Sequence, residues 1–187
     1  MAGILRWQRS LQWVVPINRL NHAVLYVRDA ERTAAFFVDV LGFVRIGQYE
    51  GVPGSAFLRA EGSTNDHDLG LFSIGAAATE SPAGRSSVGL YHLAWEVDTL
   101  TDLQRYAEKL SAAGALVGAT DHGTTRSLYA KDPDGIEFEV VWILPADQLT
   151  PADTPAMRPL DLVADIARFG ADTLGGVGIS RPKITAS

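Results

Sequence analysis

The sequence is 187 residues long, 47% hydrophobic, and carries a net charge of −6 with an isoelectric point near 5.1. This length suits one compact domain with appendages. The acidic balance argues against nucleic acids and anionic membrane surfaces as partners, because both attract basic proteins. The chain has no cysteine, so any metal must be bound by histidine and carboxylate. No stretch approaches the length of a membrane span, and we expect a cytoplasmic protein.

The first third of the chain predicts one strand, one helix and three further strands. Residues 1–17, with scattered tryptophan and arginine, are expected to form an arm that packs on the domain or on a second subunit. Residues 20–27 have the apolar pattern of a strand. Asp29 has the residue type of a helix N-cap, and Gly42 that of a helix end. The further strands, separated by turn residues, are predicted at residues 43–46, 56–59 and 67–72.

The same order recurs 70 residues later, after a connection at residues 73–87. A strand begins at His92, and a helix at residues 103–113 stops at Gly114. An Asp-Pro-Asp-Gly turn at residues 132–135 joins the last two strands. The strands after the helix are predicted at residues 116–118, 125–130 and 136–143. This internal repeat predicts an α+β fold made of two βαβββ units.

Histidines concentrate in these repeated units. The chain has four, and all lie in or beside predicted strands: His22, His67, His92 and His122. His22 and His92 occupy equivalent positions, so units related by a pseudo-twofold axis can bring them together. Glu137 and Glu139 share one face of the last strand, and either can supply a carboxylate. Two histidines and one carboxylate form the facial triad of non-haem iron(II). A single strand histidine is more often a hydrogen-bonded core or edge residue, but two at matched positions are a less common coincidence.

The repeat and its motifs resemble the vicinal oxygen chelate superfamily, also called the glyoxalase, bleomycin-resistance and extradiol-dioxygenase superfamily. Within it, the chain is most similar to single-domain extradiol dioxygenases related to catechol 2,3-dioxygenase. The resemblance implies one domain at residues 18–144, with modules at about residues 18–74 and 88–144 and a curved mixed sheet around a metal site. The motifs are Leu20-Asn21-His22-Ala23-Val24, Asp66-His67-Asp68-Leu69, Leu90-Tyr91-His92-Leu93-Ala94, Asp121-His122-Gly123, Leu128-Tyr129 and Asp132-Pro133-Asp134-Gly135 through Glu139.

The resemblance also implies the metal ligands. It makes His22, His92 and Glu139 the ligands of Fe(II), with Mn(II) as an alternative that leaves no trace in the sequence. The family's carboxylate lies four residues after the glycine of the Asp-Pro-Asp-Gly turn, which selects Glu139. Glu137 is then solvated or lies behind the ligands.

Three further residues match functional positions of the family. His67 resembles its acid–base residue beside bound oxygen, and His122 the residue that hydrogen-bonds the substrate. Tyr129 matches the tyrosine that contacts the metal-bound catechol oxygen. By themselves, these residues could equally be a turn histidine, a loop cap and an interface aromatic.

The resemblance therefore implies an Fe(II)-dependent extradiol dioxygenase that cleaves a catechol-type substrate with O2, as a homodimer or higher homo-oligomer. Two alternatives stay open. A glyoxalase-like lyase or isomerase usually takes a fourth, carboxylate ligand from the last strand of the first unit, and residues 69–72 contain none. A drug-binding protein of this fold needs no metal.

Two departures limit what the resemblance says about the substrate. Many extradiol enzymes carry an additional inactive copy of the domain, whereas this chain has one copy. Residues 145–187, a Pro-rich linker with a short helix around Ile166, lie outside the motifs. We expect this helix to cover the mouth of the site or to pack on a partner subunit.

Overall fold

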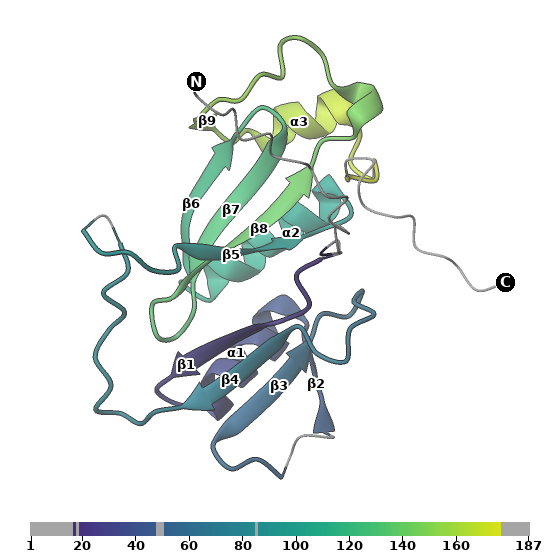
Figure 1. The fold of residues 1–187 in the computed structure, drawn as a ribbon. Helices are drawn as coiled ribbons and strands as arrows, with labels where there is room; N and C mark the ends of the chain where they lie inside the picture. The colour runs from purple at the N-terminus through teal and green to yellow at the C-terminus, as the bar shows by residue number, and fades with distance from the viewer. Residues whose placement is uncertain (1–16, 18, 48–50, 85, 177–187) are drawn as a thin grey trace, which may run out of the picture.

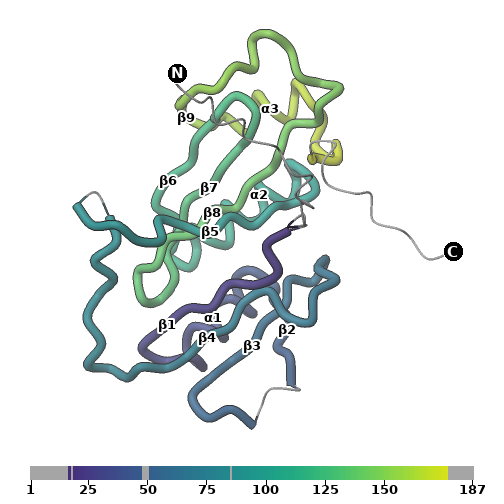
Figure 2. The backbone as a smooth tube through the Cα atoms, in the orientation of Figure 1, coloured from purple at the N-terminus to yellow at the C-terminus, as the bar shows by residue number. Residues whose placement is uncertain are grey.

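The computed structural model describes residues 17, 19–47, 51–84 and 86–176 (Figure 1). The predicted arm of residues 1–17 lies outside them, except for Ile17. Two units of one strand, one helix and three strands follow each other along the chain, and a long connection between them swings away from both sheets (Figure 2). The predicted α+β class and the order of elements are confirmed. In the described residues, no helix is long and apolar enough to cross a membrane.

The first unit forms a four-stranded mixed sheet in the order β1-β4-β3-β2. Strand β1 runs parallel to β4, while β3 is antiparallel to both β4 and β2. The helix α1 packs on this sheet. Its elements are β1 (Ala23–Val27), α1 (Ala30–Leu41), β2 (Val44–Arg45), β3 (Ser55–Arg59) and β4 (Leu69–Ser73).

The second unit repeats this arrangement in the order β5-β8-β7-β6, and β9 (Arg158–Pro159) extends the sheet beyond β6. Strand β5 is parallel to β8, and the other neighbours are antiparallel. Its elements are β5 (His92–Glu96), α2 (Leu100–Ala112), β6 (Leu116–Asp121), β7 (Thr125–Lys131) and β8 (Glu137–Ile143).

Local sequence explains where the first helix begins and ends. The Asp29 carboxylate accepts hydrogen bonds from the backbone N–H groups of Glu31 and Arg32, which have no partner inside the helix. Gly42 then takes a left-handed conformation, with φ 72°, and its N–H bonds back to the last turn. Both predicted helix signals are confirmed.

Strand alternation decides which side chains reach the exposed face of each sheet. On β1, Leu25 and Val27 are buried against the core, whereas Val24 and Tyr26 are exposed. His22 directly precedes the strand and shares the exposed face because it is two residues from Val24. The helices cover the opposite face, so the chemistry-bearing histidine is left accessible.

An aromatic cluster joins the two units. Phe37 on α1 lies 5.7 Å from the ring of Phe138 on β8, and Phe36 lies 6.1 Å from the same ring. The Trp95 ring on β5 contacts Phe43, with centroids 5.1 Å apart. These contacts merge the two halves into one hydrophobic core.

The Asp-Pro-Asp-Gly turn adds a polar link between the units. Asp132 Oδ1 accepts the backbone N–H groups of Asp134 and Ile136, which fixes where β8 begins. The Asp134 carboxylate then accepts hydrogen bonds from the backbone N–H of Arg28, at 2.7 Å, and from its guanidinium. Because the turn is held at the end of β1, the strand that carries Glu139 has a fixed position relative to the first unit.

The segment after β8 packs on the second unit of the same chain. It contains a short 3-10 helix (Ala146–Gln148), β9 (Arg158–Pro159) and α3 (Leu162–Phe169). Helix α3 lies against α2, and the Phe169 ring contacts that of Trp142 with centroids 5.7 Å apart. The short helix was predicted, but the two-residue strand β9 was not.

Candidate metal and substrate site

His92 and Glu139 form a pair on neighbouring strands of the second sheet. β5 begins at His92 and runs parallel to β8, with Ala94 beside Glu139 in the register. The His92 Nε2 atom lies 3.0 Å from Glu139 Oε2, and the two side chains are 25% and 11% exposed. Of the two glutamates considered as ligands, Glu137 and Glu139, it is Glu139 whose carboxylate lies beside His92.

This separation suits two kinds of contact. It is that of a hydrogen bond between an imidazole N–H and a carboxylate. It is also the distance of about 3 Å expected between two ligand atoms set at a right angle, each about 2.1 Å from one cation. The other ring nitrogen of His92, Nδ1, is buried and has no hydrogen-bond partner among the described residues. The pair thus provides two donor atoms of the types that Fe(II) and Mn(II) accept.

Tyr129 lies directly beside this pair. It faces Glu139 across the antiparallel β7 and β8, and its ring lies 5.6 Å from that of His92. Burial, then the charge of Glu139 and the proximity of Tyr91, raise the pKa of the Tyr129 phenol above its usual value. The phenol therefore stays protonated at neutral pH and can donate a hydrogen bond.

His122 follows β6 and completes this group. Its Nε2 atom lies 2.8 Å from the Tyr129 hydroxyl, and its Nδ1 lies 3.2 Å from the backbone carbonyl of Ala156 in the C-terminal segment. Of the six residues predicted for the site, the second unit brings together His92, Glu139, Tyr129 and His122.

The other two residues, His22 and His67, meet in the first unit. Their rings lie 4.5 Å apart, and the Phe57 ring packs edge-on against His67 at 5.2 Å. His22 Nδ1 lies 2.7 Å from the side-chain oxygen of Asn21, and His67 is buried beside Asp66. Because β4 begins at Leu69, His67 belongs to the turn before the strand rather than to the predicted strand.

A buried amide holds this turn in place. The Asn65 side chain donates to the backbone carbonyl of Asn21, at 2.7 Å, and to Asp68 Oδ1, at 2.6 Å. Asp68 also accepts from Ser63 and from the backbone of Ala60. The network fixes the turn against the segment before β1, which explains why two histidines 45 positions apart in sequence are stacked.

The two groups approach each other but do not merge. His22 lines a small cavity of about 240 Å³ together with Leu93, Ala94 and Trp95, the residues that follow His92 on β5. Within residues 17, 19–47, 51–84 and 86–176, no three His, Asp or Glu side chains are close enough to hold one metal ion. The three-ligand set of His22, His92 and Glu139 stays a prediction.

A second, larger cavity of about 1080 Å³ lies at the far end of β1. It is lined by Tyr26 and Arg28, by residues 78–84 of the connection between the units, and by residues 131–137. Glu137 borders this cavity, whereas Glu139 is not among the residues that line it.

Sequence reasoning missed several neighbours of these histidines. The Tyr91 ring lies 4.7 Å from His92, Phe57 packs on His67, and Asn65 ties the turn to the first strand. Tyr91 directly precedes His92, and this adjacency was a usable signal. The contact between His122 and Ala156 had none, because a backbone carbonyl leaves no mark in a sequence.

A family model matches more than half of the chain. The glyoxalase/bleomycin resistance protein/dioxygenase superfamily model matches residues 19–140, which contain the first unit and the second unit as far as the middle of β8. The chain belongs to this superfamily. Membership confirms the resemblance proposed from the sequence and accounts for the duplicated βαβββ unit.

Members of the superfamily with curated functions include dioxygenases. A manganese-dependent 2,3-dihydroxybiphenyl 1,2-dioxygenase from Geobacillus genomosp. 3 is 26% identical over 130 residues, covering 67% of this chain and 37% of that protein. A catechol-2,3-dioxygenase from Bacillus subtilis (strain 168) is 30% identical over 123 residues, covering 66% of this chain and 41% of that protein. The chain thus spans about two fifths of the length of these relatives.

Solved structures support the fold. A lactoylglutathione lyase from Agrobacterium tumefaciens superposes with a TM-score of 0.50 at 22% identity, covering 67% of this chain and 94% of that chain. At this identity, the similarity concerns the superfamily fold alone.

Proposed function

We propose that the protein is a metal-dependent extradiol dioxygenase that uses O2 to cleave a catechol-type ring beside its two hydroxyls. The observation that carries this proposal is the contact of His92 with Glu139 at 3.0 Å, flanked by the Tyr129–His122 hydrogen bond at 2.8 Å. Superfamily relatives named as dioxygenases of aromatic diols support it. One relative is named as manganese-dependent, and we propose Fe(II) for this chain, with Mn(II) as the alternative.

The proposed metal ligands are His92, Glu139 and His22. The first two present their donor atoms at a separation that suits one cation, and His22 borders the cavity next to β5. When bound, a divalent iron or manganese ion supplies Lewis-acid and redox chemistry that side chains lack. A histidine binds such an ion as the neutral imidazole, so metal affinity should fall as the pH falls.

Tyr129 and His122 would orient the substrate. The phenol stays protonated and its hydrogen bond to His122 holds its position, so its oxygen lone pairs can accept a hydrogen bond from a catechol hydroxyl. The imidazole of His122 can take up or return a proton through that hydroxyl. Both groups lie half-buried, where water competes less for their hydrogen bonds.

His67 is the proposed acid–base residue on the first unit. It is 8% exposed and packs between the rings of His22 and Phe57, which limits its contact with water. An imidazole titrates near neutral pH and can therefore hold a proton at one step and return it at another. Homo-oligomeric assembly and a cytoplasmic location are further parts of this proposal.

The test is oxygen consumption by protein reconstituted with Fe(II) under anaerobic conditions and then offered catechol, alkyl-catechols and aryl-catechols. We expect stoichiometric metal binding, oxygen uptake and a coloured ring-fission product. Glu139→Gln should abolish uptake, whereas Glu137→Gln, on the same strand but beside the other cavity, should retain metal binding.

Each other outcome points to a different function. Stoichiometric metal binding without oxygen uptake across the panel would favour a lyase or isomerase. Protein that binds no Fe(II) or Mn(II) would favour a metal-free binder of small molecules. Loss of metal in Glu137→Gln but not in Glu139→Gln would reassign the carboxylate ligand.

A further inference from the structure

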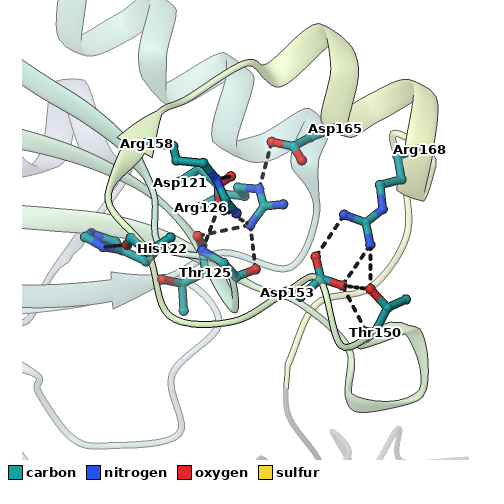
Figure 3. Close-up of polar contacts among 11 residues, drawn as sticks. Asp121, His122, Thr125, Arg126, Thr150, Asp153, Arg158, Asp165 and Arg168 are labelled. Carbon is teal, nitrogen blue, oxygen red and sulfur yellow. Dashed lines mark hydrogen bonds and ion pairs between the residues drawn. The ribbon is translucent and has the colours of Figure 1, made fainter.

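A segment of the C-terminal region, residues 150–159, lies across the end of the β6–β7 hairpin (Figure 3). We call it the strap. Two backbone contacts join it to His122: the Ala156 N–H donates to the His122 carbonyl at 3.2 Å, and the Ala156 carbonyl lies 3.2 Å from His122 Nδ1. The strap therefore holds both the backbone and the ring of this histidine.

The ring contact determines the tautomer of the neutral imidazole. A carbonyl oxygen can only accept a hydrogen bond, so His122 Nδ1 must carry the hydrogen. In the neutral ring, Nε2 is then an acceptor, and the Tyr129 hydroxyl at 2.8 Å must donate to it. The strap thus sets the direction of the His122–Tyr129 hydrogen bond.

Ion pairs around a buried arginine attach α3 and the strap to the second sheet. Arg126 on β7 is 2% exposed, and its guanidinium contacts Asp165 on α3 at 2.7 Å and Asp121 at 2.8 Å. Arg158, in the strap itself, contacts the other oxygen of Asp121 at 3.0 Å. Burial raises the pKa of Asp121, but hydrogen bonds from the Gly123 N–H and Arg158, with the charge of Arg126, lower it overall.

A second anchor lies at the other end of the strap. The Asp153 carboxylate accepts hydrogen bonds from both terminal nitrogens of Arg168 on α3, each at 2.8 Å, and from Thr150. These paired bonds form the bidentate geometry that fixes position as well as charge. Figure 3 shows the first anchor near His122, and the second, between Asp153 and Arg168 on α3, farther from the histidine.

The fit between strap and hairpin excludes a side chain at one position. A Cβ added at Gly123 would lie 2.1 Å from the Thr154 carbonyl oxygen, far inside contact distance. Gly123 also has a φ of +84°, a conformation that costs other residues about 1 kcal/mol or more. The glycine after His122 is therefore needed for the strap to seat.

From these contacts we infer that the strap is a positioning element of the site. It holds His122 as the Nδ1–H tautomer, so that Tyr129 donates its proton toward Nε2 and keeps its oxygen lone pairs for a ligand. The strap's role in catalysis rests on the proposed function, whereas the tautomer of His122 does not. Ala156 and Gly123 act through His122 and do not touch substrate.

The direct test is nitrogen-15 NMR of the histidine rings at alkaline pH, where the neutral imidazole carries one ring hydrogen. His122→Gln identifies the resonances of His122. We expect the Nδ1–H tautomer at His122 in the wild-type protein. Predominance of the Nε2–H tautomer there would overturn the inference, whatever the protein catalyses.

A matched pair of glycine variants tests the role of the strap. Gly123→Ala and Gly114→Ala both place a Cβ at positive φ, but a Cβ at Gly114 meets nothing within 4 Å. Gly123→Ala should give mixed His122 tautomers and, in the active enzyme, a kcat lower by about 10- to 100-fold with a smaller change in KM. Gly114→Ala should keep the wild-type tautomer and kcat. Equal behaviour of the two variants would refute the strap's role.

A second comparison covers the case that Gly123→Ala does not fold. The double variant Arg158→Ala/Arg168→Ala removes two half-exposed arginines that anchor the strap. Its control, Arg32→Ala/Arg105→Ala, removes two exposed arginines on α1 and α2. Only the first pair should give mixed tautomers at His122, and a wild-type tautomer in both would contradict the inference. Protein that shows the tautomer but consumes no oxygen would reject the dioxygenase proposal alone.

Discussion

The two units share a fold and differ in what surrounds their histidines. β1 pairs with β4 in the same register in which β5 pairs with β8, so Gly70 occupies in the first unit the position that Glu139 holds in the second. A Cβ at Gly70 would already lie 3.3 Å from the Phe57 ring, so that position is filled by an aromatic side chain. Duplication thus preserved the scaffold, while the carboxylate is found on one side only.

The side chains that contact the equivalent histidines, His22 and His92, also differ. In the second unit, the histidine faces a carboxylate and a tyrosine, and the C-terminal strap holds a further histidine behind them. In the first unit, the histidine stacks on another imidazole and contacts an amide oxygen. Under the proposed function, the second unit binds a cation and orients a ligand, and the first unit supplies one metal ligand and a proton-transfer group.

The largest predicted effect comes from removing the two equivalent histidines. If one metal ion joins the units, His22→Ala and His92→Ala should each weaken Fe(II) affinity beyond the roughly 10- to 100-fold loss typical of outer-layer partners. Isothermal titration under anaerobic conditions measures this. His67→Phe, which removes the neighbouring imidazole, should keep the affinity and lose oxygen uptake. Unchanged affinity in His22→Ala would confine the metal to the second unit.

The shared core makes a second prediction, on stability. Phe138 is 2% exposed and contacts the rings of Phe36 and Phe37 from the other unit. Phe138→Ala should lower the free energy of unfolding by about 3–5 kcal/mol, because it removes a buried aromatic and leaves a cavity. Urea unfolding followed by fluorescence measures the change. A loss below about 1 kcal/mol, equal to that of the half-buried Phe72→Ala, would mean that the units do not share a core.

Tyr129 predicts a smaller effect, confined to turnover. Tyr129→Phe keeps the ring contact with His92 but removes the hydroxyl that bonds to His122. We expect kcat to fall by about 100-fold with unchanged metal affinity, since a positioned proton-transfer group contributes about that much. Steady-state oxygen uptake and metal titration together measure this. A parallel loss of metal would show that the tyrosine acts on the ligands instead.

The smallest effect concerns acid stability at the strap. Hydrogen bonds from Arg168 and Thr150 hold the pKa of Asp153 well below its usual value, and burial opposes them. A lowered folded-state pKa gives stability that is complete above the unfolded pKa of about 3.9 and is lost as the pH falls through the folded value. Asp153→Asn should therefore destabilise the protein at neutral pH and much less at about pH 2, well below the unfolded pKa.

Thermal unfolding at both pH values measures this difference. Asp147→Asn, on the neighbouring 3-10 helix, serves as the control because Asp147 is outside the ion pairs of the described residues. Equal destabilisation by Asp153→Asn at both pH values would show that the carboxylate charge is not what anchors the strap.

Much of the scaffold could be predicted from the sequence because its signals are local. The cap at Asp29, the helix end at Gly42 and the Asp-Pro-Asp-Gly turn each act through their own backbone neighbours, and each was found where expected. The preference for Glu139 over Glu137 required knowledge of the family, because both glutamates lie on the same face of one strand. In the structure, Glu139 contacts His92 at 3.0 Å, and its role as a metal ligand stays a prediction.

What could not be predicted depends on contacts between distant segments. The stacking of His22 on His67 requires the Asn65 network, and the tautomer of His122 requires a carbonyl from Ala156. Arg126 is buried in contact with two aspartates that come from separate segments. None of these contacts has a periodicity or a motif, since each depends on how the chain folds back on itself.

Under the proposed function, this chain inserts both oxygen atoms of O2 into a catechol. The measurement that tests it most directly is mass spectrometry of the product formed by Fe(II)-reconstituted protein from catechol under oxygen-18 gas. Our account predicts that both atoms of one O2 molecule enter a ring-opened product, and that Glu139→Gln forms none. A product without the label, or labelled product at wild-type rate from Glu139→Gln, would contradict it.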